Sequence, residues 1–82
     1  MGRPVKKAPA NLSRNARLLA GSVRRLRLEA GLSQEELAQA ADVRQALISE
    51  VERGEANPTL ESLTKIANAL KVQLSDLFGS DH

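Results

Sequence analysis

The chain has 82 residues, enough for one domain with a small core, because a domain of this size buries only about 60% of its unfolded surface. It contains no cysteine, which excludes disulfides and thiolate metal sites. Residues 1–30 carry eight of the 12 basic side chains and one of the 10 acidic side chains, which gives a net charge of +7. Residues 31–82 carry the other four basic and nine acidic side chains, which gives a net charge of −5. This basic N-terminal third indicates either a polyanionic partner or merely a solvated helix face.

The N-terminal residues predict a tail followed by a helix. Residues 1–12 contain two prolines and few large apolar side chains, a composition typical of a flexible basic tail. Its cations are Arg3, Lys6 and Lys7. A helix is expected from near Ser13 to a C-terminal cap at Gly31. Its apolar residues recur at steps of four, three and four, at Leu19, Val23, Leu26 and Ala30.

The stretch from Gln34 to Asn57 predicts two short amphipathic helices joined by a tight turn. Ser33 and Glu36 fit a capping box at the start of the first helix. One apolar stripe runs through Leu37, Ala38 and Ala41, and the same spacing returns at Leu47, Ile48 and Val51. Val43 is an isolated apolar residue in the turn, where it can fill the corner between the two helices.

The C-terminal part predicts two further helical segments. Gly54 ends the preceding helix, and Thr59 is a capping residue for the next one. The expected buried stripe of that helix is Leu60, Leu63, Ile66, Ala67 and Leu70. A last short turn carries Leu74, Leu77 and Phe78. The expected organisation is a flexible tail (1–12), one all-α domain of five helices (13–79) and a short C-terminal tail (80–82).

Three stretches, GLSQEELAQAA, VRQALISEVERG and NPTLESLTKIANAL, follow one another in this order. Together they resemble the phage repressor and Cro-like (XRE-type) helix-turn-helix family, and the resemblance covers roughly residues 18–78. It implies a compact five-helix, lambda-repressor-like bundle. It further implies binding to double-stranded operator DNA as a twofold dimer, with the third helix in the major groove.

The resemblance also implies roles for particular residues. The base-reading positions are Arg44, Gln45, Ala46, Ser49 and Glu50. Their chemistry suits guanine for Arg44, adenine for Gln45, the thymine methyl for Ala46 and cytosine for Glu50. The phosphate-binding positions are Ser33, Gln34, Arg53 and Asn57. The basic residues Arg3, Lys6 and Lys7 are a possible arm on DNA, or else only a solubilising end.

Four further residues concern the architecture that the resemblance implies. Arg27 and Glu52 are expected to form a structural ion pair that orients the helices. Asp42 replaces the glycine usual at the turn, and Asp enters left-handed conformations more easily than most residues. Arg44 stands where a Ser or Thr commonly caps the third helix, so Asp42 is an alternative cap.

No constellation in the sequence predicts catalysis. The lone histidine is the terminal His82, and neighbouring carboxylates such as Glu35 and Glu36 point apart on a helix. No glycine-rich phosphate loop is present. We therefore expect no enzyme activity, no cofactor and no metal. No apolar run approaches the roughly 20 residues of a membrane span, and the N-terminus lacks a secretory signal, so a cytoplasmic location is expected.

The expected function is a homodimeric transcriptional regulator, a repressor or autoregulatory controller, at a palindromic site. Leu74, Leu77 and Phe78 are the apolar groups most available for a dimer contact, unless they complete the monomer core. The alternatives are an antitoxin-type or adaptor protein whose main partner is another protein, and a nucleoid-like protein that binds DNA without sequence preference. The sequence indicates no effector.

Overall fold

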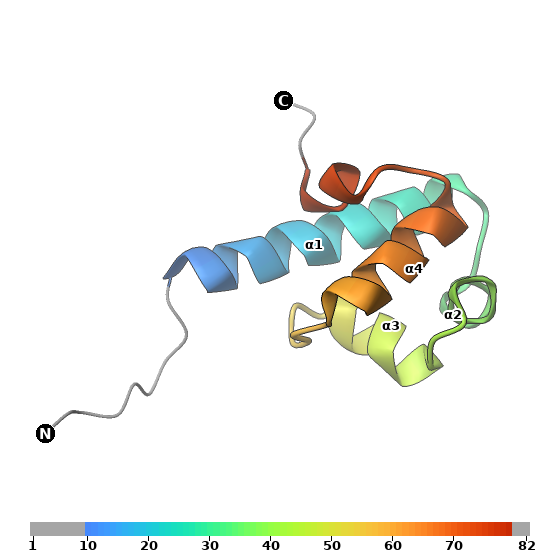
Figure 1. Ribbon diagram of the computed structural model, residues 1–82, viewed down its shortest axis with the longest axis horizontal. Coiled ribbons are helices and arrows are strands. Elements are labelled where there is room, and N and C mark those ends of the chain that lie inside the picture. Colours follow the sequence, from blue (N-terminus) through green and yellow to red (C-terminus); the bar gives the residue numbers. More distant parts are fainter. Residues whose placement is uncertain (1–9, 80–82) are drawn as a thin grey trace, which may run out of the picture.

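A computed structural model describes residues 10–79. Four α-helices and one 3-10 helix follow each other in this part of the chain (Figure 1): α1 (Ala10–Glu29), α2 (Gln34–Ala41), α3 (Gln45–Glu52), α4 (Leu60–Leu70) and η1 (Leu74–Phe78). Residues 10–79 contain no strand, so the all-α prediction is confirmed. Among these helices, none combines the length and the apolar character that a membrane crossing requires.

Two details of the predicted helices were wrong. The fifth helix is not an α-helix but a 3-10 turn of five residues, closed by Gly79 at a φ of 68°. Helix α1 begins at Ala10, before the start expected near Ser13. The arm residues Arg3, Lys6 and Lys7, and the C-terminal residues 80–82, lie outside the described residues.

The capping box at the start of α2 is confirmed. The amide of Glu36 donates to the Ser33 hydroxyl oxygen at 2.9 Å, and the amide of Ser33 donates to the Glu36 carboxylate at 2.8 Å. At the other end, Asp42 adopts the left-handed conformation, with φ 59° and ψ 47°. This conformation ends α2 abruptly, so α3 can begin at Gln45, just three residues after Asp42.

Helix α3 begins without a side-chain cap. Its N-cap is Arg44, whose side chain accepts no bond from the helix. The alternative cap, Asp42, faces α4 instead, where its carboxylate lies 3.9 Å from the Lys65 ammonium. Two backbone amides of the first turn of α3 still bond to the Arg44 carbonyl, so the helix is held by main-chain contacts.

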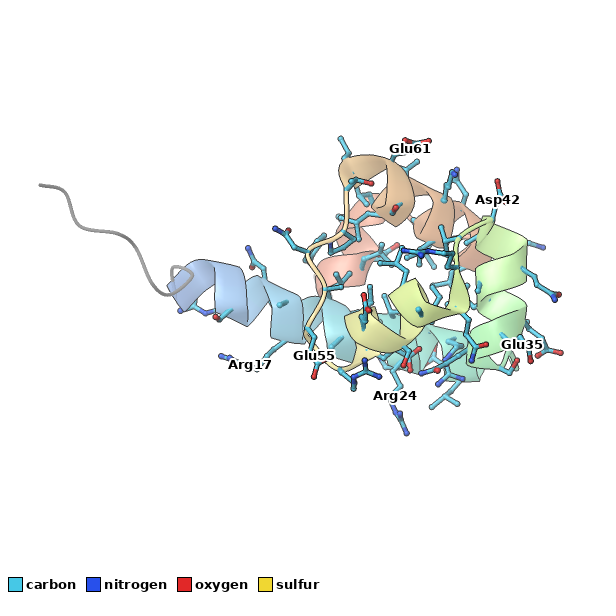
Figure 2. All side chains as sticks on the ribbon, turned by 90° about the horizontal axis from the view of Figure 1, so that it is seen from below. Arg17, Arg24, Glu35, Asp42, Glu55 and Glu61 are labelled. Atoms are coloured by element: carbon cyan, nitrogen blue, oxygen red, sulfur yellow. The ribbon has the colours of Figure 1, made fainter. Side chains whose placement is uncertain are left out.

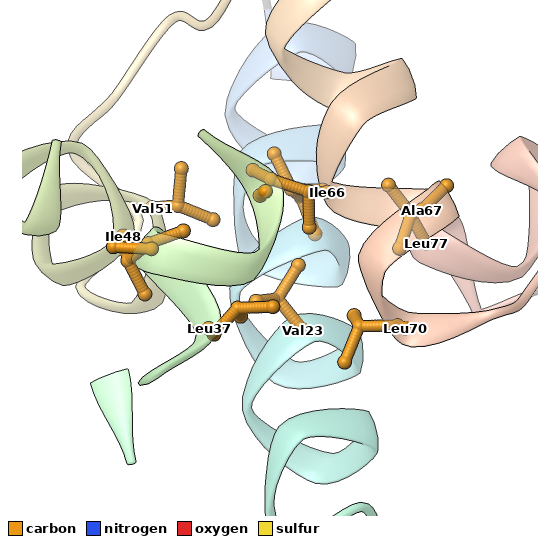
Figure 3. Close-up of a cluster of buried hydrophobic side chains, with 11 residues drawn as sticks. Val23, Leu37, Ile48, Val51, Ile66, Ala67, Leu70 and Leu77 are labelled. Carbon is orange, nitrogen blue, oxygen red and sulfur yellow. The ribbon is translucent and has the colours of Figure 1, made fainter. Parts of the chain in front are cut away.

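The core is a single cluster to which every helix contributes (Figure 3). Its members are Leu19, Val23, Leu37, Ala38, Ala41, Ile48, Val51, Ile66, Ala67, Leu70 and Leu77. The small residues Ala38 and Ala41 are buried on α2, which packs closely against both α3 and α4. Val43, in the turn, packs against the cluster as expected of a residue that fills the corner.

Two residues of the predicted apolar stripes are exposed. Leu60 is 67% exposed at the first position of α4. Ala30 is exposed because α1 ends one residue earlier, at Glu29. Leu77, proposed for a dimer contact, is instead fully buried in the monomer core, while Leu74 and Phe78 are half-buried beside it.

Candidate nucleic-acid interface

Helix α3 separates its side chains into a buried and an exposed face. Ile48 and Val51 are almost completely buried and fix the helix on α1 and α2. Four of the five candidate base-reading residues are exposed, and Ser49 is half-buried. The exposed four are Arg44, Gln45, Ala46 and Glu50. A short helix anchored in this way presents its outer side chains from a rigid base.

A buried ion pair connects α1 to α3. The Nε of Arg27 donates to Glu52 Oε2 at 2.6 Å, and its Nη2 donates to Glu52 Oε1 at 3.0 Å. A third bond runs from Arg27 Nη1 to the Leu32 carbonyl at 2.8 Å. The two side chains are only 9% and 3% exposed. This bidentate pair, expected from the resemblance, fixes the angle between the two helices.

Glu52 also receives a bond from the start of α2. The side-chain amide of Gln34 donates to Glu52 Oε1 at 3.1 Å. Burial acts to raise the pKa of the Glu52 carboxyl, but hydrogen bonds from Arg27 and Gln34, with the nearby charges of Arg27 and Arg24, hold that pKa below its ordinary value. The hydrogen bond to Glu52 in turn raises the pKa of Arg27. A charged carboxylate therefore joins three helices at one point.

The side-chain amide of Gln34, a candidate phosphate ligand, thus already uses part of its hydrogen-bonding capacity. Its amide nitrogen carries two hydrogens, and the bond to Glu52 uses one of them. The other hydrogen can still meet an anion, as can the backbone amides of Gln34 and Glu35, whereas those of Glu36 and Leu37 already donate to Ser33. Neighbouring Ser33 is exposed; its oxygen accepts the cap bond, which leaves its hydroxyl hydrogen as a donor.

The side chain of Arg53 is held by two neighbours. Its Nη1 donates to the Ser49 hydroxyl at 2.6 Å, and its Nε donates to Glu55 at 3.0 Å. Ser49, a candidate base reader, is therefore bonded to a candidate phosphate ligand. Sequence reasoning missed this contact, although the spacing of four residues on one helix face would have indicated it.

A polar groove of about 400 Å³ lies between the turn, α3 and the start of α4. Arg44, Glu50 and Asn57 line it, together with Lys65. The groove brings two candidate base readers beside the exposed Asn57, a candidate phosphate ligand. Lys65 was not predicted from the sequence, and it adds a cation that Asp42 and Glu61 partly neutralise at 3.9 and 3.8 Å.

Known proteins are similar to this chain in sequence and in fold. The helix-turn-helix family model matches residues 23–77. The chain is 44% identical over 68 residues to control protein C.BamHI of Bacillus amyloliquefaciens. The aligned region covers 80% of this chain and 84% of that protein. It is 32% identical over 59 residues to the immunity repressor protein of Bacillus phage phi105, covering 72% of this chain but only 41% of that longer protein.

A solved structure agrees with these relatives. The restriction-modification controller protein C.AhdI from Aeromonas hydrophila superposes with a TM-score of 0.76 at 33% identity, over 80% of this chain and 96% of that one. The match in sequence and in fold spans the two helices around the turn and the core that supports them. The chain therefore belongs to the helix-turn-helix family, and it is a DNA-binding transcriptional regulator.

Proposed function

We propose that the chain binds a palindromic site in double-stranded DNA as a homodimer, with α3 of each subunit in the major groove. The observation that carries this proposal is the division of α3 into a buried apolar face and an exposed face that holds Arg44, Gln45 and Ala46. A major groove about 12 Å wide admits one such helix. Two subunits would then meet half-sites about 34 Å apart.

Base reading would fall mainly on Gln45 and Arg44. Both are exposed at the start of α3 and neither has a side-chain hydrogen bond within residues 13–79. Glutamine can bond to adenine at two points, and arginine can do the same to guanine. Ser33, Gln34, Arg53 and Asn57 surround α3 and would fix its register on the phosphates.

The dimer contact would lie at the end of η1, without Leu77. Leu74 and Phe78 are half-buried there, and Leu18 of α1 is 41% exposed. A Cβ at Gly79 would come within 3.7 Å of Leu18 Cδ2, so Leu18 lies beside the end of η1. Leu18→Glu should convert the dimer to monomers in sedimentation, while the similarly exposed Leu28→Glu should leave it intact. A Leu18→Glu variant that stays dimeric would contradict this assignment.

The regulator would act as a repressor or autoregulatory controller in the cytoplasm, without catalysis. Similarity to a control protein and to a phage repressor supports this role. Selection of binding sites from random DNA at one salt concentration tests the proposal. Wild-type protein should return a palindrome, and Gln45→Ala should lose preference at one symmetric position. A specific protein discriminates against bulk DNA by about 10³–10⁷, so equal affinity for both would overturn the proposal.

A further inference from the structure

Two arginines on α1 lie along one edge of the protein, outside the turn and α3, and have no role in the interface described above. Arg17 and Arg24 are seven residues apart, nearly two full turns, so their side chains leave the helix on the same side. Both are exposed, and within residues 13–79 neither takes part in an ion pair. Figure 2 shows both along one edge of the molecule, together with Glu55. We call these two residues the α1 arginine edge.

The α1 arginine edge adjoins the candidate interface at two places. Arg24 is close enough to Glu52 for its charge to act on that carboxylate, which itself bonds to Gln34 at the start of α2. At the other end, a Cβ at Gly54 would lie 4.0 Å from the Ala16 carbonyl, so the loop after α3 rests on α1 beside Arg17. The edge therefore continues outward from Gln34 and Arg53, two candidate phosphate ligands.

Gly21 lies between the two arginines and leaves the helix surface bare. It is exposed, and a Cβ there would meet no atom within 4 Å. Packing inside the protein therefore does not require a glycine, although glycine weakens the interior of a helix. A bare helix surface does permit close approach by a bulky ligand, such as a sugar-phosphate backbone.

The spacing of the edge fits a nucleic-acid strand. Seven residues of helix span about 10 Å, and one strand of a duplex carries a phosphate about every 3.4 Å along its axis. We propose that Arg17 and Arg24 bind two backbone phosphates of the DNA that flanks each half-site, with Gly21 facing the strand between them. This inference rests on the proposed function, since it needs α3 to place the duplex.

The test compares the salt dependence of binding to two duplexes by fluorescence anisotropy. One duplex ends at the edge of the selected site, and the other extends about 10 base pairs beyond each end, close to one helical turn. Each phosphate contact adds roughly 0.9 to the slope of log affinity against log salt. Arg17→Gln/Arg24→Gln should lower that slope by roughly two per subunit on the long duplex and leave it unchanged on the short one.

Arg25→Gln is the matched control for Arg24→Gln alone, because each removes one positive charge from the same helix, and Arg25 lies about 100° around the helix axis from Arg24. Arg25 is also exposed, with Glu29 at 3.5 Å. Gly21→Leu, which adds bulk without changing charge, should weaken binding to the long duplex alone. The inference would be overturned by an unchanged slope on the long duplex, by an equal loss on both duplexes, or by a loss in Arg25→Gln equal to that in Arg24→Gln.

These results separate the inference from the proposed function. If wild-type protein prefers the selected site over bulk DNA while the double variant keeps its slope, then only the α1 arginine edge is wrong. If wild-type protein shows no such preference, then the proposed function itself fails.

Discussion

Replacing Arg27 by methionine should reveal how much the buried ion pair supports the domain. The substitution removes all three hydrogen bonds of the guanidinium and leaves Glu52, which is 3% exposed, with Gln34 as its remaining donor. Breaking a buried pair in this way costs about 3–5 kcal/mol. We expect the lower end, about 3 kcal/mol, because Gln34 still bonds to the carboxylate.

A loss of about 3 kcal/mol corresponds to a fall in Tm of roughly 12–24 °C for a domain of this size. Thermal unfolding followed by circular dichroism measures it. Arg25→Met is the control, since the pair of Arg25 with Glu29 is 48% and 62% exposed and contributes at most about 0.5 kcal/mol. Equal Tm values for the two variants would refute the reasoning.

The pH dependence gives the same prediction a second readout. In the wild type, the folded pKa of Glu52 lies below its ordinary value, so its stabilising effect is present above that value and is lost as the pH falls through the folded pKa. In Arg27→Met, the arginine no longer offsets the effect of burial, so the pKa of Glu52 in the folded protein rises. Acidification from about pH 7 to about pH 5 should therefore stabilise this variant relative to the wild type. A constant difference in Tm over that range would contradict the assigned cause.

Three further predictions concern single exposed positions. Asp42→Gly should raise the free energy of unfolding by about 0.5 kcal/mol, because Asp42 is held at a φ of 59°; chemical denaturation measures it, and no gain would show that the contact with Lys65 outweighs the backbone cost. Arg44→Thr should stabilise α3 by about 1 kcal/mol through a new N-cap yet weaken specific DNA binding; unchanged affinity would remove Arg44 from base reading. Glu55→Gln, which releases Arg53 and removes a negative charge, should raise DNA affinity several-fold in anisotropy titrations at low salt; unchanged affinity would place Glu55 away from the duplex.

The sequence predicted those features that depend on local spacing. The capping box of Ser33 and Glu36 and the two central helices follow from intervals of three and four residues, and the structure reproduces them. The prediction that Leu60 is buried was wrong, because periodicity assigns a residue to a helix face but does not show whether another element covers that face at the helix end. The bonds of Gln34 to Glu52 and of Arg53 to Glu55 depend on side-chain rotamers, which spacing alone does not determine.

The charges around α3 bear on how such a protein would find its site. Arg44 and Arg53 are accompanied by Glu50 and Glu55, so the exposed face of α3 and the loop after it carry almost balanced charge. Non-specific binding to DNA depends on net positive charge, and this face therefore attracts bulk DNA weakly. If α3 contacts base edges as proposed, its balanced charge would favour binding to the correct sequence over binding to bulk DNA. The steering charge lies instead on α1, where Arg17 and Arg24 are unopposed by ion pairs within residues 13–79.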